Sequence, residues 1–199
     1  MQKLKSILLF VLWLTSGNLL AQVGQQRVDA KEAASLDAER EKHALQVLAK
    51  LAEKLVVSAA DAMPADKYGF APTDGEFKDV RTFGQMVKHL SATNYILAAA
   101  ALGEEPPADA GDEVGPEAVR TKAQILNYVK GSFVYLDKAV ESIGQKNTRV
   151  RSSPISPLKS TEATRLALVV ESIVHAFDHY GQMVEYLRMN GVVPPASRL

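Results

Sequence analysis

The spacing of apolar residues in the first third of the chain constrains the fold more than any other feature. Between residues 29 and 63, apolar side chains recur at positions 44, 48, 51, 55, 59 and 62. Steps of three and four residues place side chains on one face of an α-helix, so this pattern predicts a long amphipathic helix. Ala, Leu and Val supply most of the apolar content and only 7% of the residues are aromatic, which favours packed helices over sheets.

Three further helices are predicted beyond this segment, over residues 82–102, 121–143 and 160–190. Thr82 and Thr121 each begin a Thr-x-x-Gln sequence, which is typical of a capping box at a helix start. Gly191 is expected to be the left-handed cap of the last helix. The Pro- and Gly-containing segments between the helices are predicted loops, over residues 64–81, 103–116 and 144–159. Four helices without a strand pattern in 199 residues predict an all-α four-helix bundle with one core.

The first 21 residues have the composition of a secretory signal peptide. Lys3 and Lys5 form a basic start, residues 7–14 (ILLFVLWL) are an unbroken apolar run, and Ala21 is a small residue at the end. The apolar run is much shorter than the roughly 20 residues that span a membrane. We therefore predict a signal peptide over residues 1–21 and a secreted or periplasmic domain over residues 22–199, not attached to a membrane after cleavage. The alternative is an uncleaved N-terminal anchor.

Charge and cysteine content exclude several classes of function. Removal of residues 1–21 takes away two of the 23 basic residues and none of the 23 acidic ones, which leaves a net charge of about −2. No basic stripe remains, so no nucleic-acid partner is predicted. The chain has no Cys and therefore neither disulfides nor thiolate ligands. Any metal site built from side chains must use histidines and carboxylates.

His175 and His179 are four residues apart in the predicted fourth helix, so their rings lie on one face of it. Two such rings can reach one metal ion at the ~2.0–2.1 Å typical of Zn–N bonds. The neighbouring residues on that face, which include Gln182 and Tyr186, are a mixture of polar and apolar types that favours the wall of a cleft. The larger apolar residues cluster on the opposite side; they are Leu166, Val169, Val170, Ile173, Phe177, Tyr180 and Val184.

Two other histidines and one carboxylate complete the set of candidates. His43 lies off the apolar stripe of the first helix, and we interpret it as a surface residue. His89 lies on the flank of the apolar stripe of the second helix, a position that permits it to face a crevice without requiring it. Glu171 lies one turn before His175 and could orient a histidine ring, act as a fourth ligand or remain solvated.

Three segments are similar to a known family: residues 63–72 (MPADKYGFAP), 79–95 (DVRTFGQMVKHLSATNY) and 179–197 (HYGQMVEYLRMNGVVPPAS). Together they make residues 40–199 resemble the DinB-like superfamily of small bacterial four-helix proteins. In that superfamily a histidine of the second helix and an HxxxH pair of the fourth form a metal-binding triad. The resemblance therefore implies that His89, His175 and His179 are metal ligands here.

Three neutral imidazoles would leave a divalent ion with an open coordination position, which is the arrangement of catalytic sites. The expected cofactor is Zn, Ni or Fe, and the expected activity is that of a metal-dependent transferase or hydrolase on a small-molecule substrate. Characterised relatives in this superfamily include thiol-dependent S-transferases and an isomerase. Because their thiol cosubstrates are cytoplasmic, an exported member is expected to carry out other chemistry, such as metal-assisted hydrolysis.

Two other functions fit the same sequence. One is a non-catalytic extracytoplasmic bundle that binds a metal or small ligand, with Glu171 closing the coordination sphere. The other is a metal-free structural or dimerisation domain. The chain is also a candidate homodimer, because small helical proteins commonly pair about a two-fold axis.

Overall fold

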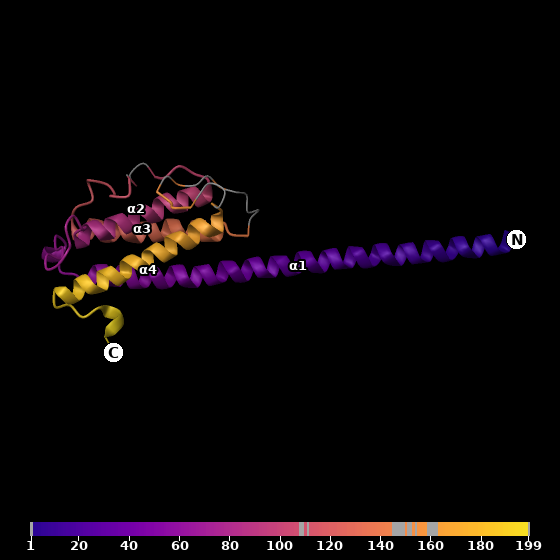
Figure 1. Cartoon of the computed structure of the whole chain (residues 1–199), viewed down its shortest axis with the longest axis horizontal. Helices are drawn as coiled ribbons and strands as arrows, with labels where there is room; N and C mark the ends of the chain where they lie inside the picture. The colour runs from indigo at the N-terminus through magenta and orange to yellow at the C-terminus, as the bar shows by residue number, and fades with distance from the viewer. Residues whose placement is uncertain are drawn as a thin grey trace. The chain divides into compact units, whose positions relative to one another are not determined.

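A computed structural model of the chain contains four α-helices and no strand among the residues that it describes (Figure 1). These are residues 2–107, 110, 112–144, 150, 153, 155–158 and 163–198, with side chains described from residue 25 onwards except at 30. The helices are α1 (Gln2–Ala62), α2 (Phe83–Leu102), α3 (Lys122–Glu141) and α4 (Arg165–Met189). Two short 3-10 helices, η1 (Ala65–Lys67) and η2 (Pro195–Ser197), follow α1 and α4. The predicted all-α class is confirmed.

The chain divides into two compact units, residues 1–41 and residues 42–199. The second unit holds the core and all the candidate site residues. The predicted signal peptide falls in the first unit, where the side chains of residues 1–21 lie outside the described set, so export stays a prediction. Among the residues that the structure describes, no helix is both long and apolar enough to cross a bilayer.

The buried face of α1 lies about one residue away from the predicted stripe. The residues that enter the core are Leu45, Ala49, Ala52, Val56, Ala59, Ala60 and Met63. Leu48 and Leu51 of the predicted stripe remain 43% and 44% exposed, so that part of the prediction is wrong. The physical reason is that small side chains such as Ala49 and Ala52 allow close packing between helices, whereas a pattern dominated by leucines overlooks them.

The helix starts follow local side-chain chemistry. Thr82 and Thr121 both form the predicted capping boxes, in which the threonine hydroxyl accepts the backbone N–H of the Gln three residues later. α2 ends at Gly103 in the left-handed conformation, and Gly191 after α4 is also left-handed. α4 begins later than predicted, at Arg165 with Thr164 as its N-cap. Residues 160–162 of the predicted start lie outside the described residues.

α2 is the central helix of the second unit and is buried along most of its length against α3 and α4. Asn94 lies in the middle of it and is fully buried. Its side-chain N–H donates to Ser132 Oγ of α3 at 3.2 Å, and its Oδ1 accepts from Ser172 Oγ of α4 at 2.8 Å. One amide group therefore connects three helices. Such a buried polar group specifies how the helices pack because each of its partners must be in place.

We predict that Asn94→Ala lowers the free energy of unfolding by about 1–3 kcal/mol, because it leaves a cavity and removes the partners of two buried hydroxyl groups. Urea denaturation of the purified protein measures this. Asn127→Ala on the exposed side of α3 is the matched control and should change stability by less than about 0.5 kcal/mol. Equal effects of the two substitutions would contradict the role of Asn94.

Candidate metal centre

His89 of α2 and His175 and His179 of α4 meet at one place in the structure. Nε2 of His175 lies 3.2 Å from Nε2 of His89 and 3.0 Å from Nε2 of His179. The potential ligand atoms of the three residues all lie within 4.8 Å of one another, so the three could hold a metal ion. In a tetrahedral site with Zn–N bonds of 2.0–2.1 Å, two ligand nitrogens are about 3.3 Å apart. The observed spacing therefore fits a shared ion.

The protonation pattern of His89 also fits metal binding. Its Nδ1 lies 2.6 Å from the backbone carbonyl of Glu113, and this contact requires the proton to be on Nδ1. The lone pair of Nε2 is then directed toward the other two histidines. Metal-binding histidines commonly donate their second N–H to a carbonyl in this way. Glu113 belongs to the loop between α2 and α3, so this loop orients one of the three rings.

Burial keeps the histidines neutral. His89 and His179 are only 6% and 7% exposed. Burial is the main cause that lowers the pKa of all three rings, to about 3 for His175 and about 4 for His179. The neighbouring rings and the guanidinium of Arg81 lower the pKa of His175 and His179 further. At neutral pH the cluster therefore offers nitrogen lone pairs, which is the form of imidazole that binds metals.

The loop that carries Glu113 is held in place by specific contacts. The hydroxyl of Tyr128 on α3 donates to the carbonyl of Ala110 at 3.1 Å, and Tyr135 of the same helix donates to Glu104 at 2.9 Å. Gly115 has a left-handed φ of 78°, and a Cβ at this position would lie 3.3 Å from the carbonyl of Lys88. Glycine therefore allows the loop to approach α2 next to His89.

The position of the histidines on α4 differs from the predicted one. The buried arc of α4 is centred near Ala176 and includes Leu168, Ser172, His179, Met183 and Leu187. His175 and His179 lie at the edge of this arc and not opposite it, because small residues such as Ser172 and Ala176 pack closely against α2. Of the large apolar residues assigned to the core side, Val170 is exposed and Phe177 only half-buried.

Glu171 takes neither of the two metal-site roles considered for it. Its carboxylate accepts a hydrogen bond from Ser156 Oγ at 2.7 Å, and it is not part of the three-histidine group. Nδ1 of His175 is buried and has no hydrogen-bond partner among the described residues, so Glu171 does not orient this ring. The bond to Ser156 instead connects Glu171 and α4 to the loop before this helix. His43 is exposed, as predicted, and Asp178 is exposed too.

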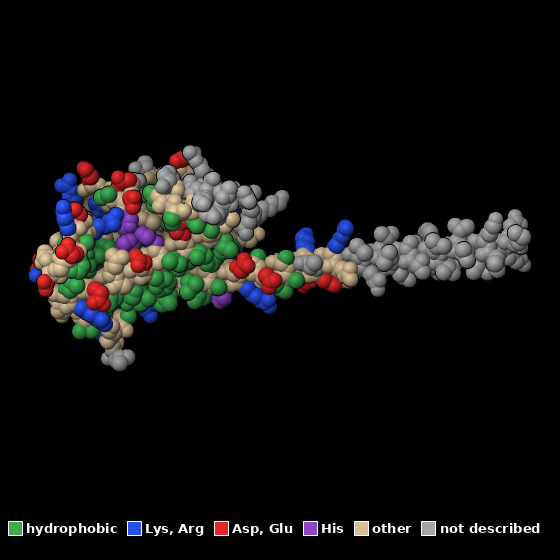
Figure 2. Space-filling model, in the orientation of Figure 1, with side chains coloured by type: hydrophobic (Ala, Val, Ile, Leu, Met, Phe, Trp, Pro, Cys, Tyr) green, Lys and Arg blue, Asp and Glu red, His purple; other side chains and the backbone are tan. Residues whose placement is uncertain are grey.

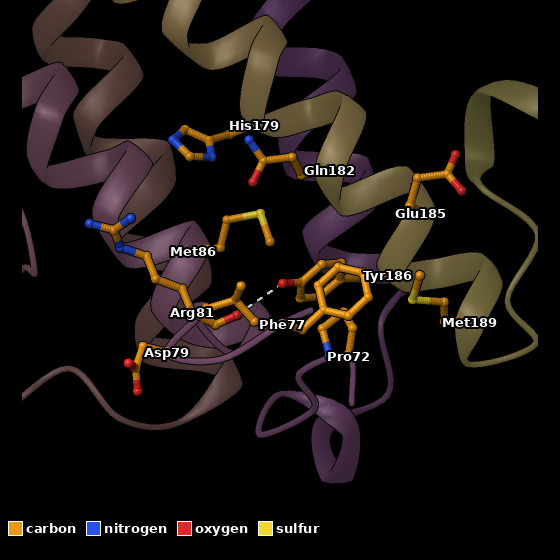
Figure 3. A pocket seen from close by; sticks show the side chains of 11 residues that line it. Pro72, Phe77, Asp79, Arg81, Met86, His179, Gln182, Glu185, Tyr186 and Met189 are labelled. Atoms are coloured by element: carbon orange, nitrogen blue, oxygen red, sulfur yellow. Dashed lines mark hydrogen bonds between the residues drawn. The ribbon is translucent and has the colours of Figure 1, made fainter. Parts of the chain in front are cut away.

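A pocket of about 480 Å³ adjoins His179 (Figure 3). Its walls come from the loop before α2, from the start of α2 and from the last turns of α4. The lining residues are Pro72, Phe77, Asp79, Val80, Arg81, Met86, His179, Gln182, Glu185, Tyr186 and Met189. Histidine side chains are visible at the surface in this part of the molecule (Figure 2). Gln182 and Tyr186 line the pocket, as predicted.

Sequence reasoning missed two residues of this region. Arg81 precedes α2 and lies in the pocket wall, 3.9 Å from a carboxylate oxygen of Glu113. No pattern in the sequence distinguishes it from the other basic residues. The carbonyl of Glu113 is a backbone atom, and its contact with His89 depends on the path of a loop. Neither residue could have been found from spacing.

The four helices and the three converging histidines define an α-helical bundle with a candidate three-histidine metal site. The family model described as DinB superfamily matches residues 29–183. The chain belongs to the DinB superfamily. A solved structure of a protein from Exiguobacterium sibiricum 255-15 assigned to the DinB family has the same fold, with a TM-score of 0.53 and 16% identity, over 76% of this chain and 92% of that one. No curated protein matches the sequence.

Proposed function

We propose that His89, His175 and His179 bind one divalent metal ion and that the protein is a metal-dependent enzyme of the transferase or hydrolase type. The observation that carries the proposal is the convergence of three Nε2 atoms beside a pocket. The donor set suits Zn, Ni or Fe. Such an ion, when bound, would supply Lewis-acid activation of a water molecule, a thiol or a carbonyl group.

The residues around the ion would have distinct tasks. The carbonyl of Glu113 orients His89 and holds its proton on Nδ1, and burial keeps the three rings neutral. The apolar side chains of Met86 and Tyr186 would limit water around the reacting group of a substrate. Gln182 also lines the pocket; its Nε2 donates to Asp178 at 2.9 Å, so its amide oxygen is the atom that could accept a hydrogen bond from that substrate.

A non-catalytic binding protein is the second candidate function, and it would need a closed coordination sphere. Glu171 is the carboxylate that was expected to close the sphere, but its bond to Ser156 holds it outside the three-histidine group. Three protein ligands with an adjoining pocket are typical of catalytic sites, whereas structural zinc sites have four. This difference favours the enzyme.

We predict that the purified protein contains one metal ion per chain and that His179→Ala loses it, because two imidazoles bind more weakly than three. Elemental analysis measures the metal content. His43→Ala, which removes an exposed histidine, is the control and should keep the ion. Added zinc should raise the melting temperature of the wild type and of His43→Ala, but not of His179→Ala.

Equal metal content in both variants would contradict the site. Catalysis is tested separately, with zinc-loaded protein and a panel of activated esters and thiol acceptors. Turnover that is lost in His175→Ala supports the enzyme. Stoichiometric metal without turnover on any member of the panel supports the binding protein instead.

Export is a further part of the proposal and rests on residues 1–21 alone. The basic start, the apolar run of eight residues and Ala21 support it. If the protein is expressed in a bacterium with an intact export pathway, mass spectrometry of the extracytoplasmic fraction should find a chain that begins at Gln22. Full-length protein that stays in the cytoplasm would contradict export.

We also propose that the protein forms a homodimer through the outer faces of α1 and α4. Figure 2 shows hydrophobic side chains gathered over these helices. The exposed apolar residues of this surface are Val47, Leu48, Leu51, Val170 and Val174. Lys54 of α1 and Asp178 of α4 lie on the same outer faces with opposite charges. A two-fold axis would bring α1 of one copy against α4 of the other, so that both the apolar residues and the charges are matched.

The predicted result is a dimer in sedimentation velocity at micromolar concentration. Leu48→Glu should convert it to a monomer, because a charge would be buried in the apolar interface. Val193→Glu, at a similarly exposed valine beyond the end of α4, is the matched control and should leave the dimer intact. A wild-type monomer, or equal disruption by both variants, would refute this interface.

A further inference from the structure

The pocket beside His179 is mostly apolar. Phe77, Met86, Tyr186 and Met189 form much of its wall, and His179 connects it to the three-histidine cluster (Figure 3). A volume of about 480 Å³ is within the range of small-molecule sites. These walls suit the hydrocarbon part of a small organic molecule. The charged residues of the same pocket determine which polar group such a molecule can have.

Arg81 is the basic residue of the pocket wall. Figure 3 shows its guanidinium beside Met86, on the side of the pocket where His179 lies. The backbone of Arg81 is held from across the pocket, because the hydroxyl of Tyr186 donates to its carbonyl at 3.1 Å. Asp79, two residues earlier, has a left-handed φ of 62°, which is an unusual conformation for a residue other than glycine. The segment that presents Arg81 is thus fixed by a turn and by α4.

The charge of Arg81 is only weakly paired within the protein. Within the part of the chain that the structure describes, its acidic partner is Glu113, at 3.9 Å, and both side chains are about half exposed. An ion pair with this spacing and exposure contributes little, so a bound anion can replace it at small cost. A guanidinium also presents two parallel N–H groups that match the two oxygens of a carboxylate.

The acidic residues of the pocket limit the charge that it can accept. Asp79 and Glu185 also line it, and Figure 3 shows both carboxylates pointing away from His179. A single guanidinium with two carboxylates nearby favours a ligand with one negative charge. A doubly charged phosphate would meet more repulsion than one arginine offsets.

We propose that the pocket binds a small organic monocarboxylate, with its carboxylate paired to Arg81 and its hydrocarbon body against Met86, Phe77 and Tyr186. This places the carboxylate end of the ligand on the side of the pocket where His179 lies, and the hydrocarbon body extends from there toward Tyr186. The assignment rests on the proposed metal-dependent function and names the substrate class for the same site. Arg81 is therefore the residue that selects the charge of the substrate.

The test is isothermal titration of zinc-loaded protein with three monocarboxylates: phenylacetate, 3-phenylpropionate and hexanoate. The corresponding amides serve as uncharged analogues, and inorganic phosphate as an alternative anion. At least one carboxylate should bind wild type at least about tenfold more tightly than its amide, since a charge-assisted bidentate contact is lost in the amide. Phosphate should bind more weakly than that carboxylate.

The same carboxylate should bind Arg81→Gln about 10- to 100-fold more weakly than wild type. Its affinity for Arg81→Lys, which keeps the charge but not the two parallel N–H groups, should lie between those for wild type and Arg81→Gln. Arg120→Gln is the matched control, because Arg120 is exposed, bonds the carbonyl of Glu117 and does not line the pocket. Zinc content and circular dichroism establish that each variant is folded. If Arg81→Gln does not fold, Arg81→Lys against Arg120→Lys gives the comparison.

Equal carboxylate binding by wild type and Arg81→Gln would overturn the inference, and so would failure of all three carboxylates to bind or a preference for phosphate. In each of these cases an unchanged zinc content of one per chain leaves the metal site intact. A wild type that takes up no zinc refutes the proposed function itself, and titration of the same carboxylates into that metal-free protein still decides whether Arg81 holds the anion.

Discussion

The packing of α4 against α2 is the constraint on which the rest of the site depends. The two helices run antiparallel, and the hydrogen bond between Asn94 and Ser172 fixes how they are aligned along their length. His89 lies five residues before Asn94 on α2. Position 177, midway between His175 and His179, lies five residues after Ser172 on α4. Because both helices advance by 1.5 Å per residue, the bond at Asn94 brings His89 level with the other two histidines.

The same alignment continues to the pocket. Tyr186 lies further along α4 and meets the carbonyl of Arg81, which precedes α2. A polar contact in the bundle core, three convergent imidazoles and an arginine at the pocket wall therefore follow one another along a single helix–helix interface. Burial in this interface also keeps the imidazoles neutral, since a charged ring would lose its hydration there. The site is a consequence of the packing and needs no irregular helix.

The sequence was informative wherever a short-range interaction decides the outcome. The capping boxes at Thr82 and Thr121 join residues three positions apart, and the histidine pair joins positions four apart on one helix. Such interactions are encoded locally, so they could be predicted. The buried faces of α1 and α4 were less predictable. There, Ala49, Ala52 and Ala176 bring helices together, and small residues contribute little to a pattern defined by large apolar side chains.

By itself the sequence determined the helical class, the boundaries of α2 and α3 to within two residues and the HxxxH pair, and its resemblance to a family made His89 a candidate. The tertiary structure alone decided that the three Nε2 atoms meet, that Glu171 bonds Ser156, and that Glu113 and Arg81 stand beside the site. The physical reason is that these contacts join segments separated by tens of residues. Their distances depend on helix alignment and loop path, which no local pattern in the chain records.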